Sequence, residues 1–271
     1  MITFSNLGKY GRLGNQLFQY AALKGLSVKN GYQIGMSSDI FSSIWHGQKC
    51  LLSNFNLNYH TTSSIGRRYN QPGDAQTFDK NFFDLEDGVD ILGFFQNLNY
   101  FHFCEQQIKE DFKINSKVQK KCDDYLQKFN GTLVSIHVRR GDNINYNQSS
   151  QDVIDNYIAK SVDYFNDDVN FLLFTGGSRS FGEDNTDDLT YLKDTYDGDK
   201  VFYSETNDPM MDFCLMTKCH HNIISHDSTF SWWAAYLNEN RNSTVICPKY
   251  HKSLEQNVEY DNFYPNNWSV L

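Results

Sequence analysis

The sequence predicts an α/β fold, and three observations support this prediction. Short apolar segments rich in β-branched residues alternate with helical segments through the second half of the 271-residue chain. The chain also begins with a strand, a glycine-containing loop and a helix, which is the usual opening of a nucleotide-binding α/β unit. With 39% apolar and 21% charged residues, the composition is that of a globular protein with a sizeable core. We therefore expect parallel sheets flanked by helices.

The first half of the chain contains few clear elements. We expect a strand at 1–4, a glycine loop over 6–14 and a helix over 15–29 that ends at Asn30-Gly31. Residues 37–88 are polar and interspersed with aromatics, which indicates loops and short helices. A strand at 91–95 and helical sequence over 105–129 follow. Asn130-Gly131 then interrupts the pattern and predicts a boundary between domains 1–130 and 131–271.

The second half is more regular and predicts a doubly wound parallel sheet. Expected strands lie at 133–138, 169–175, 200–203, 222–225 and 244–247. Expected helices lie at 151–166, 187–195, 208–218 and 229–240. Asp208-Pro209 places proline at the first position of one helix, where its missing N–H costs nothing.

The charge balance excludes one class of partner. The formal charge is −9, with 24 basic and 33 acidic residues and no basic stripe, so we expect no nucleic-acid binding. No apolar run approaches the length of a membrane span, and the first residues do not resemble a signal peptide. The six cysteines are scattered, which favours buried, reduced thiols and a cytoplasmic location. Because the net charge is negative, an anionic ligand would need a local group of basic residues, for which Arg12, Arg139 and Arg140 are candidates.

The segment Leu133-Val-Ser-Ile-His-Val-Arg-Arg-Gly-Asp142 is the most informative part of the chain. Because side chains alternate along a strand, His137 and Arg139 point to the same side. Both lie near the carboxyl end of the strand, where open α/β sheets bind ligands. Arginine forms bidentate hydrogen bonds to phosphate oxygens, which favours a phosphate-bearing ligand. The alternative is a structural pair between an arginine and Asp142 in a surface loop.

A second segment, Ile223-Ile-Ser-His-Asp-Ser-Thr-Phe-Ser-Trp-Trp, passes from a strand into a helix. Ser228 or Thr229 is a natural N-cap, and Ser231 falls in the first turn. Backbone N–H groups and the helix dipole make such a start an anion-binding position, although ordinary capping is the commoner role of these residues. Since this helix start and Arg139 are expected at the same edge of one sheet, we predict a pyrophosphate ligand.

A third segment, Gly11-Arg-Leu-Gly-Asn-Gln-Leu-Phe-Gln-Tyr-Ala21, places Asn15 and Gln16 at the start of the first helix. Asn15 is either an N-cap or a side chain that reaches a ligand. The sequence also contains one D-x-D pattern, Asp197-Gly198-Asp199, but Asp-Gly is a strong turn signal. His220 and His221 would point to opposite faces of a strand. We therefore predict no metal site.

Together the three segments resemble motifs of the bacterial-type α-1,2-fucosyltransferase family, which uses GDP-fucose. His137-Val-Arg-Arg-Gly-Asp142 is similar to the H-x-R-R-x-D motif of that family, and the segments around Gly11 and Ser228 resemble its N-terminal and C-terminal motifs. Weaker similarities lie at Leu92-Gly-Phe-Phe-Gln96, Leu215–Ile224 and Pro265-Asn-Asn-Trp268. Two departures are Phe174-Thr-Gly-Gly-Ser, where the family often has an acidic pair, and an extra residue in Ser225-His-Asp-Ser-Thr229.

The resemblance implies a GT-B-like architecture, with two Rossmann-like domains facing each other across a cleft. It implies that 1–130 is the acceptor-side domain and that 131–271 binds the GDP-sugar. It further implies inverting, metal-independent transfer of L-fucose from GDP-β-L-fucose to the 2-hydroxyl of a terminal galactoside, with no cofactor besides this donor substrate.

The same resemblance implies the roles of individual residues. The residues expected to bind the donor are Arg139, Arg140, Ser228, Thr229, Phe230, Ser231, Gly14 and Gln16. The residues expected at the reacting centre are Arg139, Asp142, His137 and Asn15. Asp142 is either the general base or a group that orients Arg139, and His137 is a possible relay.

Two other functions stay open from the sequence. One is a related transferase with another acceptor or donor, such as a protein O-fucosyltransferase or an enzyme that uses GDP-mannose. The other is a non-catalytic protein that binds a carbohydrate or nucleotide. The acceptor glycan, the oligomeric state and any peripheral association with a membrane are likewise open.

Overall fold

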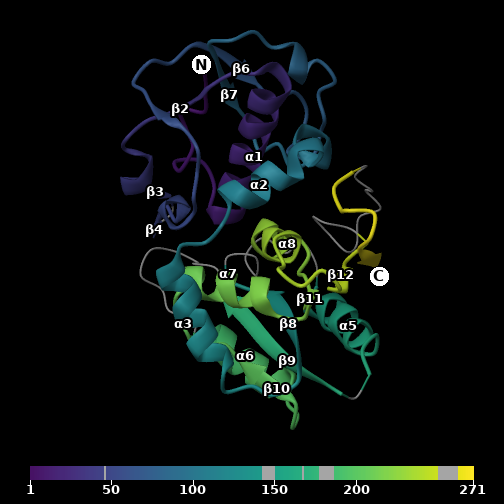
Figure 1. Cartoon of the computed structure of the whole chain (residues 1–271). Helices are drawn as coiled ribbons and strands as arrows, with labels where there is room; N and C mark the ends of the chain where they lie inside the picture. The colour runs from purple at the N-terminus through teal and green to yellow at the C-terminus, as the bar shows by residue number, and fades with distance from the viewer. Residues whose placement is uncertain (46, 142–149, 167, 177–185, 250–261) are drawn as a thin grey trace. The chain divides into compact units, whose positions relative to one another are not determined.

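The computed structural model describes residues 1–45, 47–141, 150–166, 168–176, 186–249 and 262–271. The chain forms two compact units. Unit 1 comprises Met1–Asn115 and Asp261–Asn266, and unit 2 comprises Ser116–Tyr260 and Asn267–Leu271. Each unit contains its own parallel sheet with helices packed against it (Figure 1). The predicted α/β class is therefore confirmed.

Unit 1 is built on a five-stranded parallel sheet with the order β5-β2-β1-β7-β6. Its strands are short: β1 (Ile2–Thr3), β2 (Ile34–Met36), β5 (His60–Thr61), β6 (Arg67–Asn70) and β7 (Val89–Leu92). Helix α1 (Leu13–Asn30) connects β1 to β2 and ends at Gly31 with φ 73°, the left-handed stop that the sequence predicts. The sequence predicted β1, α1 and a strand that overlaps β7. It predicted no strand at β2 and only loops and short helices for the segment that contains β5 and β6.

Short 3-10 turns and a small hairpin complete unit 1. The hairpin pairs β3 (Ile44–Trp45) with β4 (Gln48–Lys49) in an antiparallel manner. The 3-10 turns are η1 (Ile40–Ser42), η2 (Leu52–Asn54), η3 (Phe82–Asp84), η4 (Leu98–Tyr100) and η5 (His102–Cys104). These turns supply much of the aromatic core, in which Phe82 and Tyr100 are fully buried and meet edge to face at 4.7 Å.

One predicted helix, over 105–129, is wrong because the chain forms two helices there. Helix α2 (Glu105–Asp111) ends before Lys113, and α3 (Ser116–Leu126) begins after Asn115. Between them, Ile114 forms an antiparallel bridge with Phe55. Backbone hydrogen bonds to residues 54–56 replace the helical bonds here, which include Asn115 N to Asn54 O at 2.8 Å. Long-range pairing has overridden local helical preference.

Unit 2 is built on a six-stranded parallel sheet with the order β10-β9-β8-β11-β12-β13. Its strands are β8 (Thr132–Arg139), β9 (Val169–Gly176), β10 (Val201–Tyr203), β11 (His221–Ile223), β12 (Val245–Cys247) and β13 (Ser269–Val270). Its other helices are α5 (Gln151–Val162), α6 (Thr186–Thr195), α7 (Pro209–Lys218) and α8 (Thr229–Tyr236). Apart from β13, these elements agree closely with the predicted ones, because short apolar segments alternate regularly with helical segments along this part of the chain.

The boundary between the compact units lies at Asn115/Ser116, not at the predicted 130/131. The reason is that α3 packs on α7 within unit 2. The Sγ atom of Cys122 lies 3.7 Å from the Sδ atom of Met211, and Lys218 Nζ lies 2.9 Å from an oxygen of Asp123. The sequence placed the boundary at a glycine turn, but α3 belongs to the unit that covers its apolar face.

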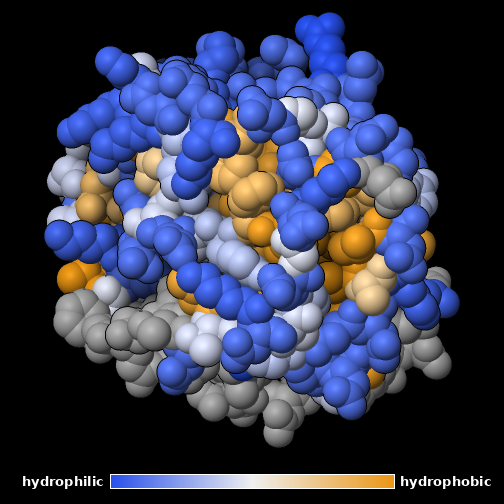
Figure 2. All heavy atoms as spheres, turned by 90° about the horizontal axis from the view of Figure 1, so that it is seen from below, coloured by the Kyte–Doolittle hydropathy of each residue, from blue (hydrophilic) through white to orange (hydrophobic). Residues whose placement is uncertain are grey.

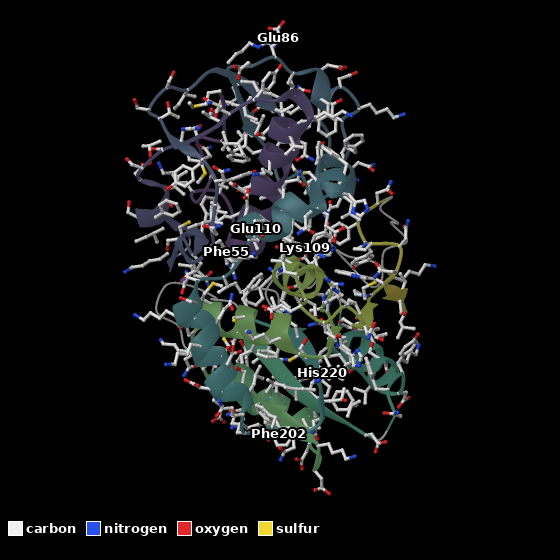
Figure 3. The ribbon with its side chains drawn as sticks, in the orientation of Figure 1. Phe55, Glu86, Lys109, Glu110, Phe202 and His220 are labelled. Carbon is white, nitrogen blue, oxygen red and sulfur yellow. The ribbon has the colours of Figure 1, made fainter. Side chains whose placement is uncertain are left out.

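The surface is mainly hydrophilic on the face that Figure 2 shows, with hydrophobic patches between the polar groups. One exposed ring, Phe202 of the edge strand β10, is labelled in Figure 3 and contacts Phe129 at 5.1 Å. All six cysteines are buried and free, as predicted. Within the part of the chain that the structure describes, no helix combines the length and apolarity needed to cross a membrane.

We expect Gly25→Ala to destabilise unit 1. A Cβ atom at Gly25 would lie 1.9 Å from the backbone oxygen of Tyr100, so α1 and η4 would have to separate. Overpacking of this kind costs about 2 kcal/mol or more of unfolding free energy, which chemical denaturation would measure. Gly198→Ala is the matched control, because its Cβ would meet only Val201 at an ordinary 3.4 Å. Equal stabilities of the two variants would contradict this packing.

Candidate active site

The candidate site lies at the point in unit 2 where the strand order reverses. From β8 the chain moves through β9 to β10 on one side, and it returns to the other side of β8 at β11. At such a switch point the loops after the two central strands separate, which leaves room for a ligand at their carboxyl ends. The predicted residues Arg139 and Ser228–Ser231 follow these two strands.

The start of α8 is organised by serine side chains. Of the two predicted N-cap candidates, Ser228 is the N-cap, and its Oγ accepts a hydrogen bond from Ser231 N at 3.3 Å. The Ser231 hydroxyl lies 3.4 Å from Ser228 O, to which it donates, and accepts from Ser225 N at 3.3 Å. Both Ser228 and Ser231 are buried, so their hydroxyls hold the helix start in place. Thr229 and Phe230, in the same turn, are half-buried and therefore partly exposed to solvent.

Arg139 is held against the same loop. Its backbone N–H donates to Ser225 Oγ at 3.1 Å, and its guanidinium donates to the backbone oxygen of Asp227. A carboxylate oxygen of Asp227 lies 3.9 Å from Arg139 Nη1. Asp227 has φ 46°, a left-handed conformation that aspartate tolerates better than most residues. The sequence did not predict Asp227 as a partner of Arg139, although the extra residue in Ser225–Thr229 indicated that this loop differs from that of the family.

His137 lies beneath the start of α8. Its Nδ1 is 3.2 Å from Ser228 Oγ, and its ring lies 5.8 Å from that of Phe230. Burial disfavours the imidazolium, and together with the charges of Arg139 and His226 it lowers the pKa of His137 to about 3. Burial likewise lowers the pKa of His226 to about 4, with a further contribution from Arg139. Both rings are therefore neutral near pH 7.

Arg139 and His137 meet the same loop, in agreement with the strand alternation, whereas Arg140 turns the other way. Arg140 Nε donates to Asp188 at 3.1 Å, and Nη1 donates to Gln151 at 2.8 Å. Its guanidinium also lies 3.6 Å from the ring centre of Tyr191. Asp188 is almost fully buried and also accepts from Gly141 N at 3.1 Å. The structure thus joins Arg140 to α5 and α6 and not to Ser228–Ser231.

The candidates in unit 1 divide into buried and half-buried groups. Gly14 is buried within α1, and Gln16 is buried with its Nε2 donating to Gly11 O at 2.8 Å. Asn15 is not the N-cap, because the helix begins at Leu13. Asn15 is half-buried, and its Oδ1 accepts from Gln96 Nε2 at 3.0 Å. Asp142 lies outside the described residues, as do Gly177 and Ser178, so their roles stay predictions.

The D-x-D pattern lies far from Arg139 along the strand direction of unit 2. Asp197 and Asp199 precede β10, so they occupy the amino edge of the sheet, whereas Arg139 ends β8 at the carboxyl edge. His220 and His221 accept hydrogen bonds from different segments, Leu133 N at 3.0 Å and Thr244 N at 2.9 Å. Among the described residues, no three His, Cys, Asp or Glu side chains form a group that could hold a metal ion.

The neutral histidines predict a pH-dependent stability. An unfolded histidine binds a proton below about pH 6.5, whereas the buried rings stay neutral down to about pH 4 for His226 and pH 3 for His137. The unfolded state therefore binds more protons in this window, and the free energy of unfolding falls as the pH drops from 6.5 towards 4. The slope is on the order of 1 kcal/mol per pH unit for each histidine.

Denaturation at pH 6.5 and pH 4.5 measures this effect. His137→Gln, which lacks the titrating ring, is expected to lose less stability over the interval than the original protein. His102→Gln, at an exposed position, is the control and is expected to leave the pH dependence unchanged. Identical pH slopes for His137→Gln and the original protein would contradict a buried neutral ring at His137.

We expect Arg140→Ala to lower the free energy of unfolding. Asp188 would keep a buried carboxylate without its cation, and breaking a buried pair costs about 3 kcal/mol. Thermal unfolding of Arg140→Ala, compared with Arg241→Ala at an exposed position, tests this expectation. A variant with unchanged stability and weakened ligand binding would instead place Arg140 among the ligand contacts.

Solved structures with a similar fold are fucosyltransferases. NodZ alpha-1,6-fucosyltransferase soaked with GDP-fucose superposes with a TM-score of 0.56 at 13% identity, over 87% of this chain and 91% of that chain. POFUT1 in complex with GDP-fucose superposes with a TM-score of 0.51 at 11% identity, over 90% and 96% of the two chains. These similarities show a GT-B-like fold, as the motif resemblance implies.

Curated relatives share more sequence identity. Galactoside alpha-(1,2)-fucosyltransferase 2 of Gorilla gorilla gorilla is 26% identical over 250 residues, which cover 84% of this chain and 67% of the relative. Galactoside alpha-(1,2)-fucosyltransferase 1 of Alouatta caraya is 26% identical over 245 residues, which cover 84% of this chain and 63% of the relative. The family model described as glycosyl transferase family 11 matches residues 5–271. With its motifs and fold in agreement with this match, the chain belongs to glycosyl transferase family 11.

Proposed function

We propose that this protein transfers L-fucose from GDP-β-L-fucose to the 2-hydroxyl of a terminal galactoside and forms an α-1,2 linkage. The observation that carries this proposal is the pairing of Arg139 with the capped start of α8 at the switch point between β8 and β11. This is a phosphate-binding arrangement within a glycosyltransferase family. The names of the curated relatives support the galactoside acceptor and the linkage.

The chemistry that we propose requires stabilisation of a leaving diphosphate. As the galactoside hydroxyl attacks the anomeric carbon opposite GDP, the configuration inverts and negative charge develops on the β-phosphate. Arg139 provides a fixed positive charge, and the first backbone N–H groups of α8 provide a dipole aimed at the same position. Together they can stabilise the departing phosphate without a metal ion. The transition state has oxocarbenium character, as in other glycosyl transfers.

His137 helps to position this arrangement in our proposal. A neutral His137 carries no charge towards the phosphate, but its contact with Ser228 Oγ fixes the N-cap and hence the direction of the first N–H groups. Asp142 follows Arg139 by three residues and is the proposed general base or the group that orients Arg139. We further propose that unit 2 binds the donor, that unit 1 binds the acceptor and that the protein acts in the cytoplasm.

The first experiment measures GDP release from GDP-fucose in excess EDTA, with and without a panel of terminal β-galactosides. Release that depends on a galactoside would support the proposed transfer and its independence of metal. Release that depends on a peptide would favour a protein O-fucosyltransferase. GDP-fucose binding without release in any condition, including added Mg²⁺ or Mn²⁺, would contradict the proposal and favour a binding protein.

We expect Arg139→Ala to lower kcat/KM by about 100-fold or more, since loss of one preorganised charge-stabilising group typically costs this much. Arg241→Ala removes an exposed arginine from the same unit and is expected to retain normal turnover. Thermal unfolding of both variants shows whether the fold is intact. Near-normal turnover by a folded Arg139→Ala variant would show that Arg139 does not stabilise the leaving group.

A further inference from the structure

Three aromatic side chains meet at the carboxyl edge of the sheet in unit 1. Tyr10 lies in the loop after β1, Trp45 lies in the hairpin that follows β2, and Phe94 lies directly after β7. The rings of Tyr10 and Phe94 stack, with centres 4.6 Å apart and an angle of 21° between the planes. Trp45 meets Tyr10 edge to face at 5.9 Å and 82°. We call these three side chains the aromatic platform.

The aromatic platform differs from the aromatic core of the unit. Its three residues are half-buried, whereas Phe4, Phe82 and Phe95 beside the sheet are completely buried. Because β1, β2 and β7 are parallel neighbours, the loops after them all emerge at one edge. This edge of an open α/β sheet is the one that binds ligands. The aromatic platform therefore combines a ligand-binding position with accessible ring surface.

A chain of side-chain amides is built next to the aromatic platform. Gln76 Nε2 donates to Gln96 Oε1 at 2.8 Å, and Gln96 Nε2 donates to Asn15 Oδ1 at 3.0 Å. Gln76 and Gln96 are buried, whereas Asn15 at the end of the chain is half-buried. Gln96 lies two residues after Phe94, so one loop supplies both a ring and an amide.

Backbone geometry also holds Asn15 near Tyr10. Gly11, the residue after Tyr10, has φ 88°, and a Cβ atom there would lie 2.7 Å from the Cβ of Asn15. Only glycine permits this close approach of the loop to the first turn of α1. The half-buried amide of Asn15 and the half-buried ring of Tyr10 are thus fixed close to one another, with the buried amides behind Asn15.

We propose that the aromatic platform binds the terminal sugar ring of the galactoside acceptor, with the Asn15 amide as a hydrogen-bonding partner for one of its hydroxyls. This inference rests on the proposed function and names the part of unit 1 that would recognise the acceptor. One face of a galactose ring carries several C–H groups, whose partial positive charge suits the negative face of an aromatic ring. Its hydroxyls require fixed polar partners, which the amide chain supplies.

The chemistry of the aromatic platform favours a neutral sugar over the donor. The stacked rings and the amides carry no charge, whereas a nucleoside diphosphate requires cations or helix N–H groups of the kind found around Arg139 in unit 2. A guanine base could also stack on a ring, so the experiment must separate acceptor binding from donor binding.

The test compares Tyr10→Leu and Phe94→Leu with the original protein in steady-state kinetics. We expect KM for a β-galactoside acceptor to rise about 10-fold, which corresponds to the loss of one aromatic contact, and KM for GDP-fucose to stay the same. Phe103→Leu, at an exposed ring outside the aromatic platform, is the matched control. Thermal unfolding confirms that each variant is folded.

An unchanged acceptor KM in the folded leucine variants, or a rise only in the KM for GDP-fucose, would overturn the inference while the proposed function stands. If the original protein does not turn over any galactoside, the proposed function fails, and binding becomes the readout. Saturation-transfer NMR with methyl β-D-galactoside is then expected to show ligand signals that Tyr10→Leu abolishes. Signals that persist in Tyr10→Leu, or that are absent with the original protein, would overturn the proposal that the aromatic platform binds the sugar ring.

Discussion

The hydrogen bonds of Ser225 join the two halves of the candidate site, and the arrangement of the other site residues depends on them. Its hydroxyl accepts from the backbone N–H of Arg139 at the end of β8, and its own N–H donates to the Ser231 hydroxyl in α8. One buried residue thus connects the last residue of a strand with the first turn of a helix. The bond to Ser231 is buried and the bond to Arg139 is partly buried, so their loss would leave polar groups without partners, which favours this single geometry.

Because side chains alternate along β8, the adjacent basic residues of this strand end contact different parts of unit 2. His137 and Arg139 face the loop before α8, where one supports the N-cap and the other presents a cation. Arg140 faces α5 and α6 and neutralises the buried Asp188, which in turn holds Gly141 N. The Arg-Arg pair therefore provides one arginine for the candidate site and one for the turn that ends the strand. In a protein with a net charge of −9, the positive charge of Arg139 is thus local and held beside the start of α8.

The two units use the carboxyl edges of their sheets differently. In unit 2 the edge carries a cation and a helix start, which suit an anion. In unit 1 it carries stacked rings and linked amides, which suit a neutral, hydroxyl-rich ring. This division of chemistry agrees with a transferase that must hold a charged donor and an uncharged acceptor, and it follows from side chains within each unit alone.

The sequence by itself determined the features that depend on local chemistry. Apolar runs define β8 and β9, and helical periodicity defines the helices between the strands of unit 2. Ser228 and Thr229 were both recognisable as candidate N-caps, and alternation along the strand placed His137 and Arg139 on the same side. Only the tertiary structure decided the features that depend on distant partners. Strands β2, β5 and β6 of unit 1 are two to four residues long, which is too short to carry a periodic signal, and they exist because neighbouring strands pair with them. Likewise, Asp227, Asp188 and Gln96 acquire their roles from partners that lie 88, 48 and 81 positions away in the sequence, since contacts of this kind leave no trace in local spacing.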